Sequence, residues 1–528
     1  MLNSMQAPRL AARAPARGGL APCRPAPSAR HSLGLTPTRA QATSTVGERP
    51  PSASPMARQP SGASVSSQGS AEPGPGARPP VESSAEVVVM VLGGGPGNDL
   101  RPLTDVRAEP AMPVAGLFRL IDIPVSNCIN SGLTQIYVLT QFNSTSLNRH
   151  LSRAYSFLNG NLFTSGRDSF VESLNASQRP GHVTADAWYQ GTADAVRRYA
   201  EYLTSEKHAA AEDVLILAGD QLYRMDYAAL INYHRARGAD VTIASTPADE
   251  DHALHLGILK VDEDLNVQCF AEKPEEETLH TMSMDTQCHY GLCATDAEER
   301  PYVASMGIYV FKKQVLLDLL TKQFPAAVDF SRDILPAVVG QNSIIAYPHT
   351  TYWEDVGSLR AYYAAHMSLA QGTLKLRLFD KQFPIYTEPR TLPPTKMTDT
   401  TLEDCLLGDG CRVIGSTLRS CVVGSCTYID RGCDLQEVIV FGADEFELDG
   451  ERAAELAGGV VPLGIGAGSV VKGAILDKNV RIGRNVRLVN EKGVRDAGPD
   501  AGLPAGVTIR DGILVVRRSA VVPDGTVV

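Results

Sequence analysis

The feature of this sequence that most restricts its fold is a six-residue repeat near the C-terminus. An apolar residue recurs at Ile509, Val515, Val521 and Val527. Three six-residue strands per coil of about 18 residues would stack each apolar residue on the next coil and bury a continuous interior. The repeat therefore predicts a parallel β-helix.

Pairs of an apolar residue and a glycine carry a related period further upstream. The pair at 407–408 reappears at 423–424 after sixteen residues, and the pair at 465–466 reappears at 482–483 after seventeen. A charged insertion around 445–456 separates these coils. Slips to five residues interrupt the period, so an antiparallel sandwich is the competing interpretation.

Before this region, apolar runs of strand length alternate with segments of helix length such as 193–203 and 313–321. The runs lie at 87–92, 136–140, 214–218, 241–245 and 306–311. Such alternation predicts an α/β domain with a parallel sheet that is covered on both faces. Ligands of these sheets bind at the carboxyl ends of the strands, so we expect the site there.

Prolines mark the boundary between the two parts of the chain. Pro384, Pro389, Pro393 and Pro394 interrupt any regular element after Gly372. The predicted segments are an N-terminal tail at 1–84, an α/β domain at 85–375, a Pro-rich linker at 376–400 and the β-helix domain at 401–528.

The first 80 residues differ from the rest in charge. They contain nine Arg, no Lys and two Glu, a net charge of +7, so the rest of the chain carries −17 and the total is −10. They lack the apolar surface that offsets the entropy of folding, so disorder is expected. An Arg-rich, acid-poor segment without an apolar stretch is typical of an organellar transit peptide, and a low-complexity tail without a targeting role is the alternative.

Composition also argues against several kinds of partner. The acidic body disfavours nonspecific binding to nucleic acid or to an anionic membrane, because both reward clustered Lys and Arg. No run approaches the roughly 18 apolar residues of a membrane span.

Five of the ten cysteines lie between Cys405 and Cys433, without CxxC spacing or a nearby His. We expect small apolar core residues in a reducing compartment, with metal ligands or disulfides as the alternative.

Residues with phosphate and metal chemistry follow the predicted strands. The glycine-rich loop at 93–97 lets backbone N–H groups approach phosphate oxygens, although a tight turn explains the same glycines. Asp220 follows the run at 214–219 and is placed to hold Mg²⁺ beside a triphosphate, with a helix N-cap as the alternative. Asp355 is a candidate second ligand or a turn residue, and Lys273 is a candidate phosphate partner or a surface lysine.

Seven motifs occur in an order that resembles the ADP-glucose pyrophosphorylase family. They are VLGGG at 91–95 with RPLT at 101–104, FRLIDIPVSNC at 118–128, WYQGTADAV at 188–196, LAGD at 217–220, FAEKP at 270–274, SMGIYV at 305–310 and YWED at 352–355. The resemblance runs from about residue 86 to the C-terminus. Within it, the sequence is similar to plant and algal subunits of the family. It implies a Rossmann-like nucleotidyltransferase domain with a mixed, mostly parallel sheet, followed by a left-handed parallel β-helix.

The resemblance also implies an activity and its site residues. The family forms ADP-glucose and pyrophosphate from ATP and glucose 1-phosphate with Mg²⁺, for starch synthesis. Catalytic roles would fall to Asp220 and Lys273, and Mg²⁺ would bind Asp220 and Asp355. The nucleotide would contact Gly93, Gly94, Gly95, Gln190 and Gly219. Glucose 1-phosphate would contact Tyr189, Gly257, Glu272, Lys273 and Ser305.

Two positions depart from the pattern of active members, which read GGGxGTRL and RAKPAVP around the triphosphate. Here Asp99 replaces the catalytic Arg and Glu109 replaces the Lys. Each change turns a cation into an anion, and one charge pair at about 4 Å is worth up to about 4 kcal/mol at an effective dielectric constant of about 20. A loss of a few kcal/mol slows a reaction roughly hundreds to thousands-fold. We therefore expect an impaired triphosphate site, with rescue by Arg101 as the alternative.

Regulation, assembly and location follow from the same resemblance. The effectors 3-phosphoglycerate and phosphate would bind Arg107, Arg119 and Lys478. Plant-type members are heterotetramers, so we expect assembly with catalytic homologues, with the chain acting either as a working adenylyltransferase or as a non-catalytic regulatory or scaffold subunit. Together with the transit segment, this implies the chloroplast stroma.

Overall fold

The computed structural model describes residues 78–95, 97–159, 169–176 and 188–528. Most of the predicted transit segment at 1–84 therefore lies outside the described residues, which begin at Arg78. Within the described part of the chain, no helix combines the length and the apolar character that crossing a membrane requires.

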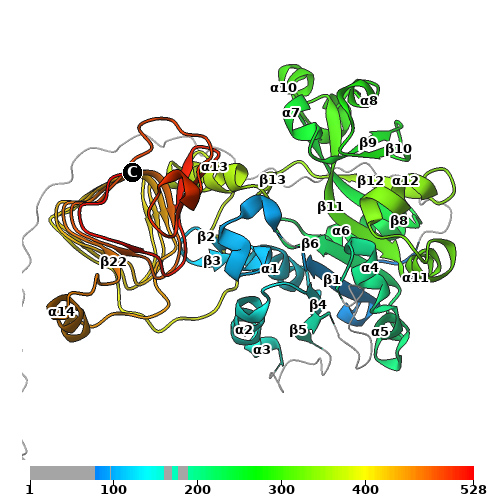
Figure 1. Cartoon of the computed structure of the whole chain (residues 1–528). Helices are drawn as coiled ribbons and strands as arrows, with labels where there is room; N and C mark the ends of the chain where they lie inside the picture. Colours follow the sequence, from blue (N-terminus) through cyan, green and yellow to red (C-terminus); the bar gives the residue numbers. More distant parts are fainter. Residues whose placement is uncertain (1–77, 96, 160–168, 177–187) are drawn as a thin grey trace, which may run out of the picture. The chain divides into compact units, whose positions relative to one another are not determined.

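A nine-stranded sheet forms the centre of the first domain (Figure 1). Its strands are β1 (Val87–Gly93), β4 (Gln135–Thr140), β5 (Phe170–Asn175), β6 (Asp213–Ala218), β8 (Val241–Ala248), β9 (Gly257–Val261), β10 (Val267–Glu272), β11 (Tyr302–Lys312) and β12 (Ile344–Pro348). They are ordered β10-β9-β11-β6-β1-β4-β5, with β8 on β11 and β12 on β8. Neighbours among β6, β1, β4 and β5 are parallel, whereas β11 runs antiparallel to β6, β8 and β9. The predicted mixed sheet is confirmed.

Both faces of this sheet are buried, as the unbroken apolar runs predicted. Val87, Val89 and Val91 of β1 belong to one core cluster, and Val88 and Met90 belong to another. The first cluster includes residues of α1 (Asp122–Asn130), α2 (Thr145–Ala154), α6 (Tyr227–Ala236) and α13 (Leu359–Ala370). The second includes residues of α4 (Thr192–Arg197), α5 (Ala200–Thr204), α11 (Lys313–Asp318) and α12 (Leu335–Val338). Helices therefore cover both faces, and the segment expected as one helix at 193–203 is divided into α4 and α5.

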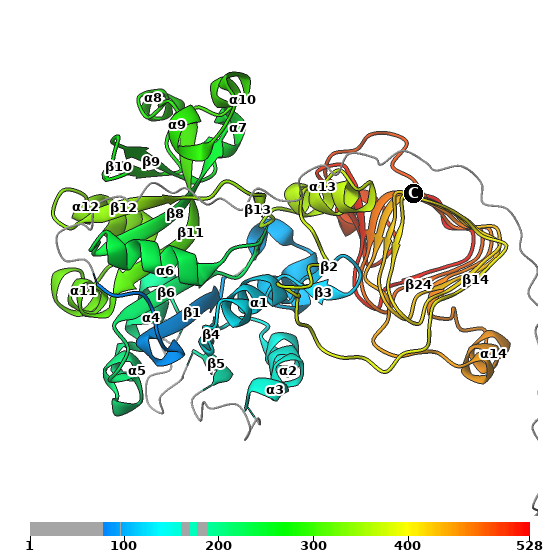
Figure 2. The same cartoon turned by 180° about the vertical axis from the view of Figure 1, so that it is seen from behind.

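The second domain is a stack of β-coils, drawn in yellow to red in Figure 2. One sheet comprises β14 (Lys396–Thr398), β17 (Arg412–Ile414), β20 (Tyr428–Ile429), β22 (Gly464–Ile465), β24 (Arg481–Ile482) and β28 (Val521–Val522). The other comprises β15 (Thr401–Glu403), β16 (Leu406–Leu407), β18 (Thr417–Arg419), β19 (Val422–Val423), β21 (Asp434–Val440), β23 (Val470–Leu476), β25 (Arg487–Leu488), β26 (Val507–Arg510) and β27 (Ile513–Val516).

The repeats of an apolar residue and a glycine are pairing partners in these coils. The six-residue repeat is confirmed only in part, because Ile509 lies in the antiparallel β26–β27 hairpin and the side chains of Val521 and Val527 are 48% and 71% exposed. Leu407 pairs with Val423 and Ile465 pairs with Ile482, each time between parallel strands. The named strands of the two sheets pair in parallel, apart from the β26–β27 hairpin. This arrangement confirms the parallel β-helix and excludes the antiparallel sandwich. The charged insertion forms α14 (Asp449–Ala457), which lies beside the coils in both views (Figures 1 and 2).

Buried contacts join the two domains. Arg107 donates to Asp477 at 2.6 Å, and both side chains are almost fully buried. Ile439, Phe441 and Ile475 of the β-helix belong to the same core cluster as one face of the sheet. Part of the chain between the domains is also fixed, since Asn130 donates to the carbonyl of Pro384 at 2.9 Å. The β-helix therefore shares a core with the α/β domain.

Candidate functional site

A short strand pair brings Asp220 and Asp355 together. Asp220 directly precedes β7 (Gln221–Tyr223), and Asp355 ends β13 (Trp353–Asp355). The two strands are antiparallel, with Gln221 opposite Asp355 and Tyr223 opposite Trp353. The carboxylate that follows the central strand β6 is therefore placed beside one that is 135 positions later in the sequence.

Close packing at Gly219 holds Glu109 against this pair. A Cβ atom at Gly219 would lie 2.8 Å from the carbonyl oxygen of Leu92 and 3.0 Å from Cγ of Pro110, so only glycine fits without a shift of the backbone. Pro110 belongs to the 3₁₀ turn η4 (Glu109–Ala111), which begins with Glu109. The predicted nucleotide residue Gly219 thus acts through packing, and it places the Glu109 carboxyl beside Asp220.

One cavity of about 1240 Å³ contains the acidic residues. Asp99 lies in the 3₁₀ turn η2 (Asn98–Leu100), which follows the glycine loop. The cavity is lined by five residues that the sequence assigned to the reaction, namely Asp99, Glu109, Asp220, Lys273 and Asp355. Four of the five are acids. The glycine loop adjoins them, since a Cβ atom at Gly95 would lie 3.8 Å from Oε2 of Glu109.

Mutual repulsion among these acids changes their protonation. Burial, together with the charges of Asp220, Asp355 and Asp99, raises the pKa of Glu109 to about 9. Burial and the charge of Asp355 raise the pKa of Asp220 to about 7. The neighbouring acids therefore favour a bound proton or a bound cation in this group.

Asp220 and Asp355 have the chemistry of a magnesium site. Two carboxylates that repel each other at the end of a central strand are stabilised by a divalent cation, and Mg²⁺ usually takes one or two carboxylates plus substrate phosphates. Among the described residues, no group of three or more His, Cys, Asp or Glu side chains is arranged to hold a metal ion. The pair therefore suits an ion that is shared with a phosphate ligand.

Lys273 supplies positive charge at the edge of this group. It is exposed, it has a left-handed φ of 47°, and its backbone N–H donates to the carbonyl of Leu256 at 3.0 Å. Its charge lowers the pKa of Asp355, against the larger effect of burial, which raises it. The residue before it, Glu272, points toward β9, where a Cβ atom at Gly257 would lie 2.8 Å from Oε2 of Glu272.

The residues expected to bind the sugar form a second group next to the first. Gly257 and Glu272 are directly paired across β9 and β10. Ser305 on β11 is buried, and its hydroxyl donates to the hydroxyl of Tyr309 at 3.5 Å. The charge of Glu272 acts on the pKa of Tyr309, so these side chains are close to each other. Gly257, Glu272 and Ser305 therefore lie together, as the resemblance implied.

Tyr189 contacts the glycine loop, whereas Gln190 is exposed. Tyr189 is buried, and its hydroxyl donates to the hydroxyl of Tyr199 at 3.1 Å. Its ring contacts the glycine loop, because a Cβ atom at Gly94 would lie 3.3 Å from Cδ2 of Tyr189. Gln190 is exposed, and its backbone N–H donates to Asp194 at 3.1 Å. Tyr189 therefore supports the nucleotide loop through its ring, and its hydroxyl points into the core.

Arg101, the alternative source of positive charge for the triphosphate site, faces a different cleft from the acids of the large cavity. Its side chain is 57% exposed and lies 3.7 Å from Asp105. It lines a separate cleft of about 510 Å³ together with Thr508 and Arg517, and it is not among the residues that line the large cavity. The geometry therefore does not favour rescue by Arg101.

Comparison with known families agrees with this geometry. Residues 88–372 match the model of the nucleotidyl transferase family. This chain belongs to that family. Residues 390–527 match the GLGC left-handed parallel beta-helix domain. The two matches together indicate a glucose-1-phosphate adenylyltransferase-like member, in agreement with the motifs in the sequence.

The predicted effector residues of this nucleotidyl transferase occupy two environments. Arg107 is 3% exposed in its ion pair with Asp477. Lys478 donates to Asp444 at 2.9 Å, and its pKa is lowered by burial and by the nearby charges of Arg390 and Arg119. Arg119 and Lys478 therefore belong to one basic cluster, and Arg107, whose charge also acts on Arg119, lies at its edge in the ion pair that joins the two domains.

The β-helix of this nucleotidyl transferase also reaches the large cavity, which the sequence did not indicate. Arg510 lines the cavity and donates to the carbonyl oxygens of Asn98 at 3.3 Å and Arg101 at 3.1 Å. These two carbonyls flank Asp99. A residue of the C-terminal domain thus holds the turn that carries Asp99 beside the cavity, and its position in the sequence gave no signal of this contact.

Proposed function

We propose that this chain is a subunit of a plant- or algal-type ADP-glucose pyrophosphorylase whose triphosphate site is impaired. One observation carries the proposal, the single cavity shared by Asp99, Glu109, Asp220 and Asp355. The metal pair and the sugar group retain the residue types that the reaction needs. Two positions beside the triphosphate lack the cations that it needs.

The proposed reaction is an in-line attack of the phosphate oxygen of glucose 1-phosphate on the α-phosphorus of ATP, with pyrophosphate as the leaving group. Positioning and charge neutralisation supply most of the catalysis in such transfers. Lys273 would neutralise the sugar phosphate, and Glu272 would accept hydrogen bonds from the glucose hydroxyls. Asp220 and Asp355 would hold Mg²⁺, which supplies positive charge to the phosphate oxygens when bound.

The two substitutions remove positive charge from the triphosphate. Asp99 and Glu109 each place a carboxyl group where a cation is needed. The deficit is therefore up to about four charges. Even a partly screened deficit of this size costs a few kcal/mol of transition-state stabilisation, which is roughly a hundred- to thousand-fold in rate.

A double variant, Asp99→Arg with Glu109→Lys, tests this proposal. Purified wild-type chain and the variant are given Mg-ATP and glucose 1-phosphate, and pyrophosphate release is measured. We expect the variant to be faster by about a hundred-fold or more. The matched control is Glu277→Lys with Glu298→Arg, which makes the same change in net charge at exposed positions outside the cavity.

The control pair should leave the rate unchanged. Wild-type turnover within about tenfold of the double variant would refute the impairment. If the double variant is also inactive while it still binds glucose 1-phosphate by calorimetry, the impairment lies elsewhere in the site and not at these two positions.

A non-catalytic regulatory or scaffold subunit is the second candidate. It is favoured by the combination of an ordered sugar group with a deficient triphosphate site, because such a chain binds sugar phosphate without turnover. We expect the chain to co-elute with a co-expressed catalytic homologue as a heterotetramer in size-exclusion chromatography. Separate elution of the two chains would contradict this role.

Effector binding and location complete the proposal. Arg119 and Lys478 would bind 3-phosphoglycerate or phosphate, so Lys478→Ala should weaken phosphate binding to the assembled tetramer, measured by calorimetry. Residues 1–84 would direct the chain to the chloroplast. A fusion of this segment to a fluorescent protein should enter isolated chloroplasts, and its exclusion from them would refute this assignment.

A further inference from the structure

Two cysteines face each other on consecutive coils of the β-helix. Cys405 follows β15 and Cys421 follows β18, and these two strands are in register. The next strands, β16 and β19, continue the same register, with Leu406 opposite Val422. The N–H of Leu406 donates to the carbonyl of Cys421 at 2.9 Å. The register therefore places Cys405 directly opposite Cys421.

This juxtaposition is specific to one pair in the cysteine-rich coils. The N–H of Arg412 donates to the carbonyl of Thr427, so Cys411 lies next to the Thr427 position. Cys433 donates its N–H to the hydroxyl of Ser416 at 3.1 Å. Cysteine faces threonine or serine at these two levels of the stack, and cysteine faces cysteine at only one level among the described coils.

The spacing of the two coils suits a disulfide. Neighbouring strands of a sheet lie about 4.8 Å apart. Disulfides join residues whose Cα atoms are about 4.4 to 6.8 Å apart. The thiols of Cys405 and Cys421 are also hydrogen-bonded to each other, so both sulfur atoms point to the same side of the coils. A bond between them would form a rung between the first two coils.

The two thiols differ in access and acidity. Cys405 is partly exposed on the terminal coil, whereas Cys421 is fully buried in the core of the β-helix. The hydrogen bond from Cys421 lowers the pKa of Cys405 to about 7. Burial and the same hydrogen bond raise the pKa of Cys421. Cys405 is therefore the thiol that an outside reagent meets first, and it is partly ionised at neutral pH.

We propose that Cys405 and Cys421 form a redox-active dithiol, which closes to an intrachain disulfide by exchange with the disulfide of an oxidised thiol compound or dithiol protein. The Cys405 thiolate attacks one sulfur of that disulfide and forms a mixed disulfide, and the other sulfur leaves as a thiolate. The thiolate of Cys421, after loss of its proton to water, attacks the Cys405 sulfur and releases the second thiolate. Two cysteines are oxidised to one disulfide, and the reagent takes up two electrons and two protons.

The rung would lie close to the contact between the domains. Cys421 is two residues before Val423, whose carbonyl oxygen would lie 2.9 Å from a Cβ atom at Gly116. Gly116 lies between β2 (Pro113–Val114) and β3 (Phe118–Arg119) of the α/β domain. The dithiol therefore lies in the coil that packs on this hairpin.

The test uses the full chain, first reduced and then incubated with oxidised glutathione at neutral pH. Free thiols are counted with a maleimide, and the intact mass is measured. We expect two fewer free thiols and a mass lower by two hydrogen atoms, both reversed by dithiothreitol. Trypsin cleavage after Lys396, Arg412, Arg419 and Arg431 should give the peptides 397–412 and 420–431 joined together, and fragmentation should place the bond between Cys405 and Cys421.

Variants distinguish this pair from other reactions. Cys405→Ser should abolish the loss of two hydrogens, and Cys421→Ser should instead trap glutathione on Cys405. The matched control, Cys288→Ser at an exposed cysteine of the other domain, should leave the intrachain bond intact. A bond that persists in Cys405→Ser, a disulfide between two chains on a non-reducing gel, or a wild type that gains only glutathione would each overturn the proposal. If Cys421→Ser does not fold, the joined peptides of the wild type still decide it.

Discussion

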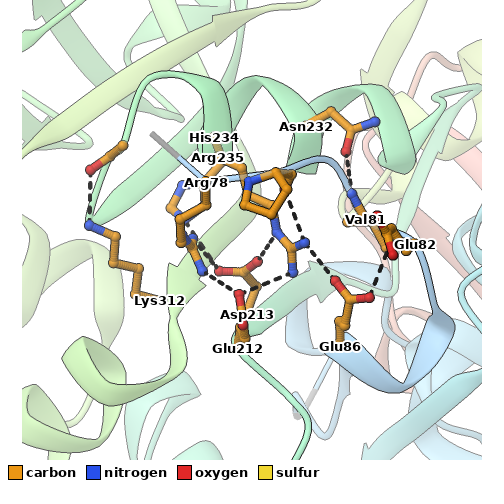
Figure 3. Close-up of polar contacts among 12 residues, drawn as sticks. Arg78, Val81, Glu82, Glu86, Glu212, Asp213, Asn232, His234, Arg235 and Lys312 are labelled. Atoms are coloured by element: carbon orange, nitrogen blue, oxygen red, sulfur yellow. Dashed lines mark hydrogen bonds and ion pairs between the residues drawn. The ribbon is translucent and has the colours of Figure 1, made fainter. Parts of the chain in front are cut away.

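The two ends of strand β6 hold opposite electrostatic arrangements. Asp213 is its first residue, and its fully buried carboxylate accepts from Nε of Arg235 at 2.7 Å and from Nη2 of Arg78 at 2.6 Å (Figure 3). Asp220 follows its last residue and faces the carboxylate of Asp355. One end of the strand pairs an acid with cations, and the other places an acid beside another acid.

The pKa values show the consequence of this difference. Burial alone would raise the pKa of Asp213, but His234 and the two arginines lower it to about 2. Nε2 of His234 lies 3.6 Å from Oδ1 of Asp213. At the other end, burial and Asp355 act together and raise the pKa of Asp220 to about 7. The first arrangement stabilises the folded chain, and the second costs stability until a ligand cation neutralises it.

The difference between the two ends of β6 indicates which end of the sheet is suited to bind a ligand. In open α/β sheets, ligands bind at the carboxyl ends of the strands, and the amino ends have no such role. Charges at the amino end of β6 can therefore be neutralised within the chain. Residues near the start of the described chain take part in these ion pairs, Arg78 with Asp213 and Glu86 with Arg235. Carboxylates without a cationic partner at the carboxyl end of β6 therefore indicate a candidate ligand-binding site.

The largest expected effect comes from breaking the compensated end. Asp213→Asn keeps the shape of the side chain but leaves Arg235, which is 1% exposed, with the Glu86 carboxylate as its remaining partner at 2.7 Å, and removes the ion pair with Arg78. Removal of one partner of a buried ion pair costs about 3–5 kcal/mol, so the free energy of unfolding should fall by that amount in urea denaturation. Asp318→Asn, at an exposed pair with Lys322, is the control and should change it little. A decrease of less than about 1 kcal/mol in the free energy of unfolding would contradict the claim that the ion pairs of Asp213 stabilise the folded chain.

Acid should weaken the same cluster. The pKa of Asp213 is lowered from the ordinary value of 3.8 to about 2 in the folded chain. Its stabilisation is therefore fully present above about pH 4 and is lost as the pH falls toward 2. The shift corresponds to about 2 kcal/mol. The difference in unfolding free energy between wild type and Asp213→Asn should be constant from pH 7 to 4.5 and should shrink below pH 4. A difference that does not change with acid would exclude this linkage.

Arg78 should contribute less than Asp213, because it is one of two arginines on the same carboxylate. It is 21% exposed and also lies 3.3 Å from Glu212. We expect Arg78→Met to lower the free energy of unfolding by about 1.5 kcal/mol. Arg153→Met is the matched control, since Arg153 pairs with Glu388 at 3.0 Å but is 62% exposed. Equal effects of the two variants would mean that Arg78 behaves as a surface residue.

The fold was largely predictable because its signals are local. Residues two and six positions apart define the strands and the coils, and the stacking of Leu407 on Val423 follows directly from the repeat. The antiparallel direction of β11 was not predictable, because a buried apolar run has the same pattern in either direction. The division of the segment at 193–203 at Arg198 and Tyr199 also has no apolar or proline signal.

The residues of the candidate cavity could be picked from the sequence, but their electrostatic interactions could not. Asp220, Lys273 and Asp355 stand in motifs that can be read in one dimension, and they line one cavity. The raised pKa of Glu109 depends on acids that are distant in the sequence, so no local pattern contains it. The same is true of Arg510, which reaches the turn at Asp99 from the far end of the chain.

The smallest expected effect has the opposite sign and tests the uncompensated end. With a chelator present, Asp220→Asn removes one of the mutually repelling carboxylates, so the free energy of unfolding should rise by about 1 kcal/mol. The proposed binding of Mg²⁺ to Asp220 and Asp355 should raise the melting temperature of the wild type. That increase should disappear in Asp220→Asn and remain in Asp251→Asn, an exposed acid outside the cavity. Destabilisation by Asp220→Asn in the chelator would mean that Asp220, like Asp213, is compensated within the chain, and the contrast between the two ends of β6 would fail.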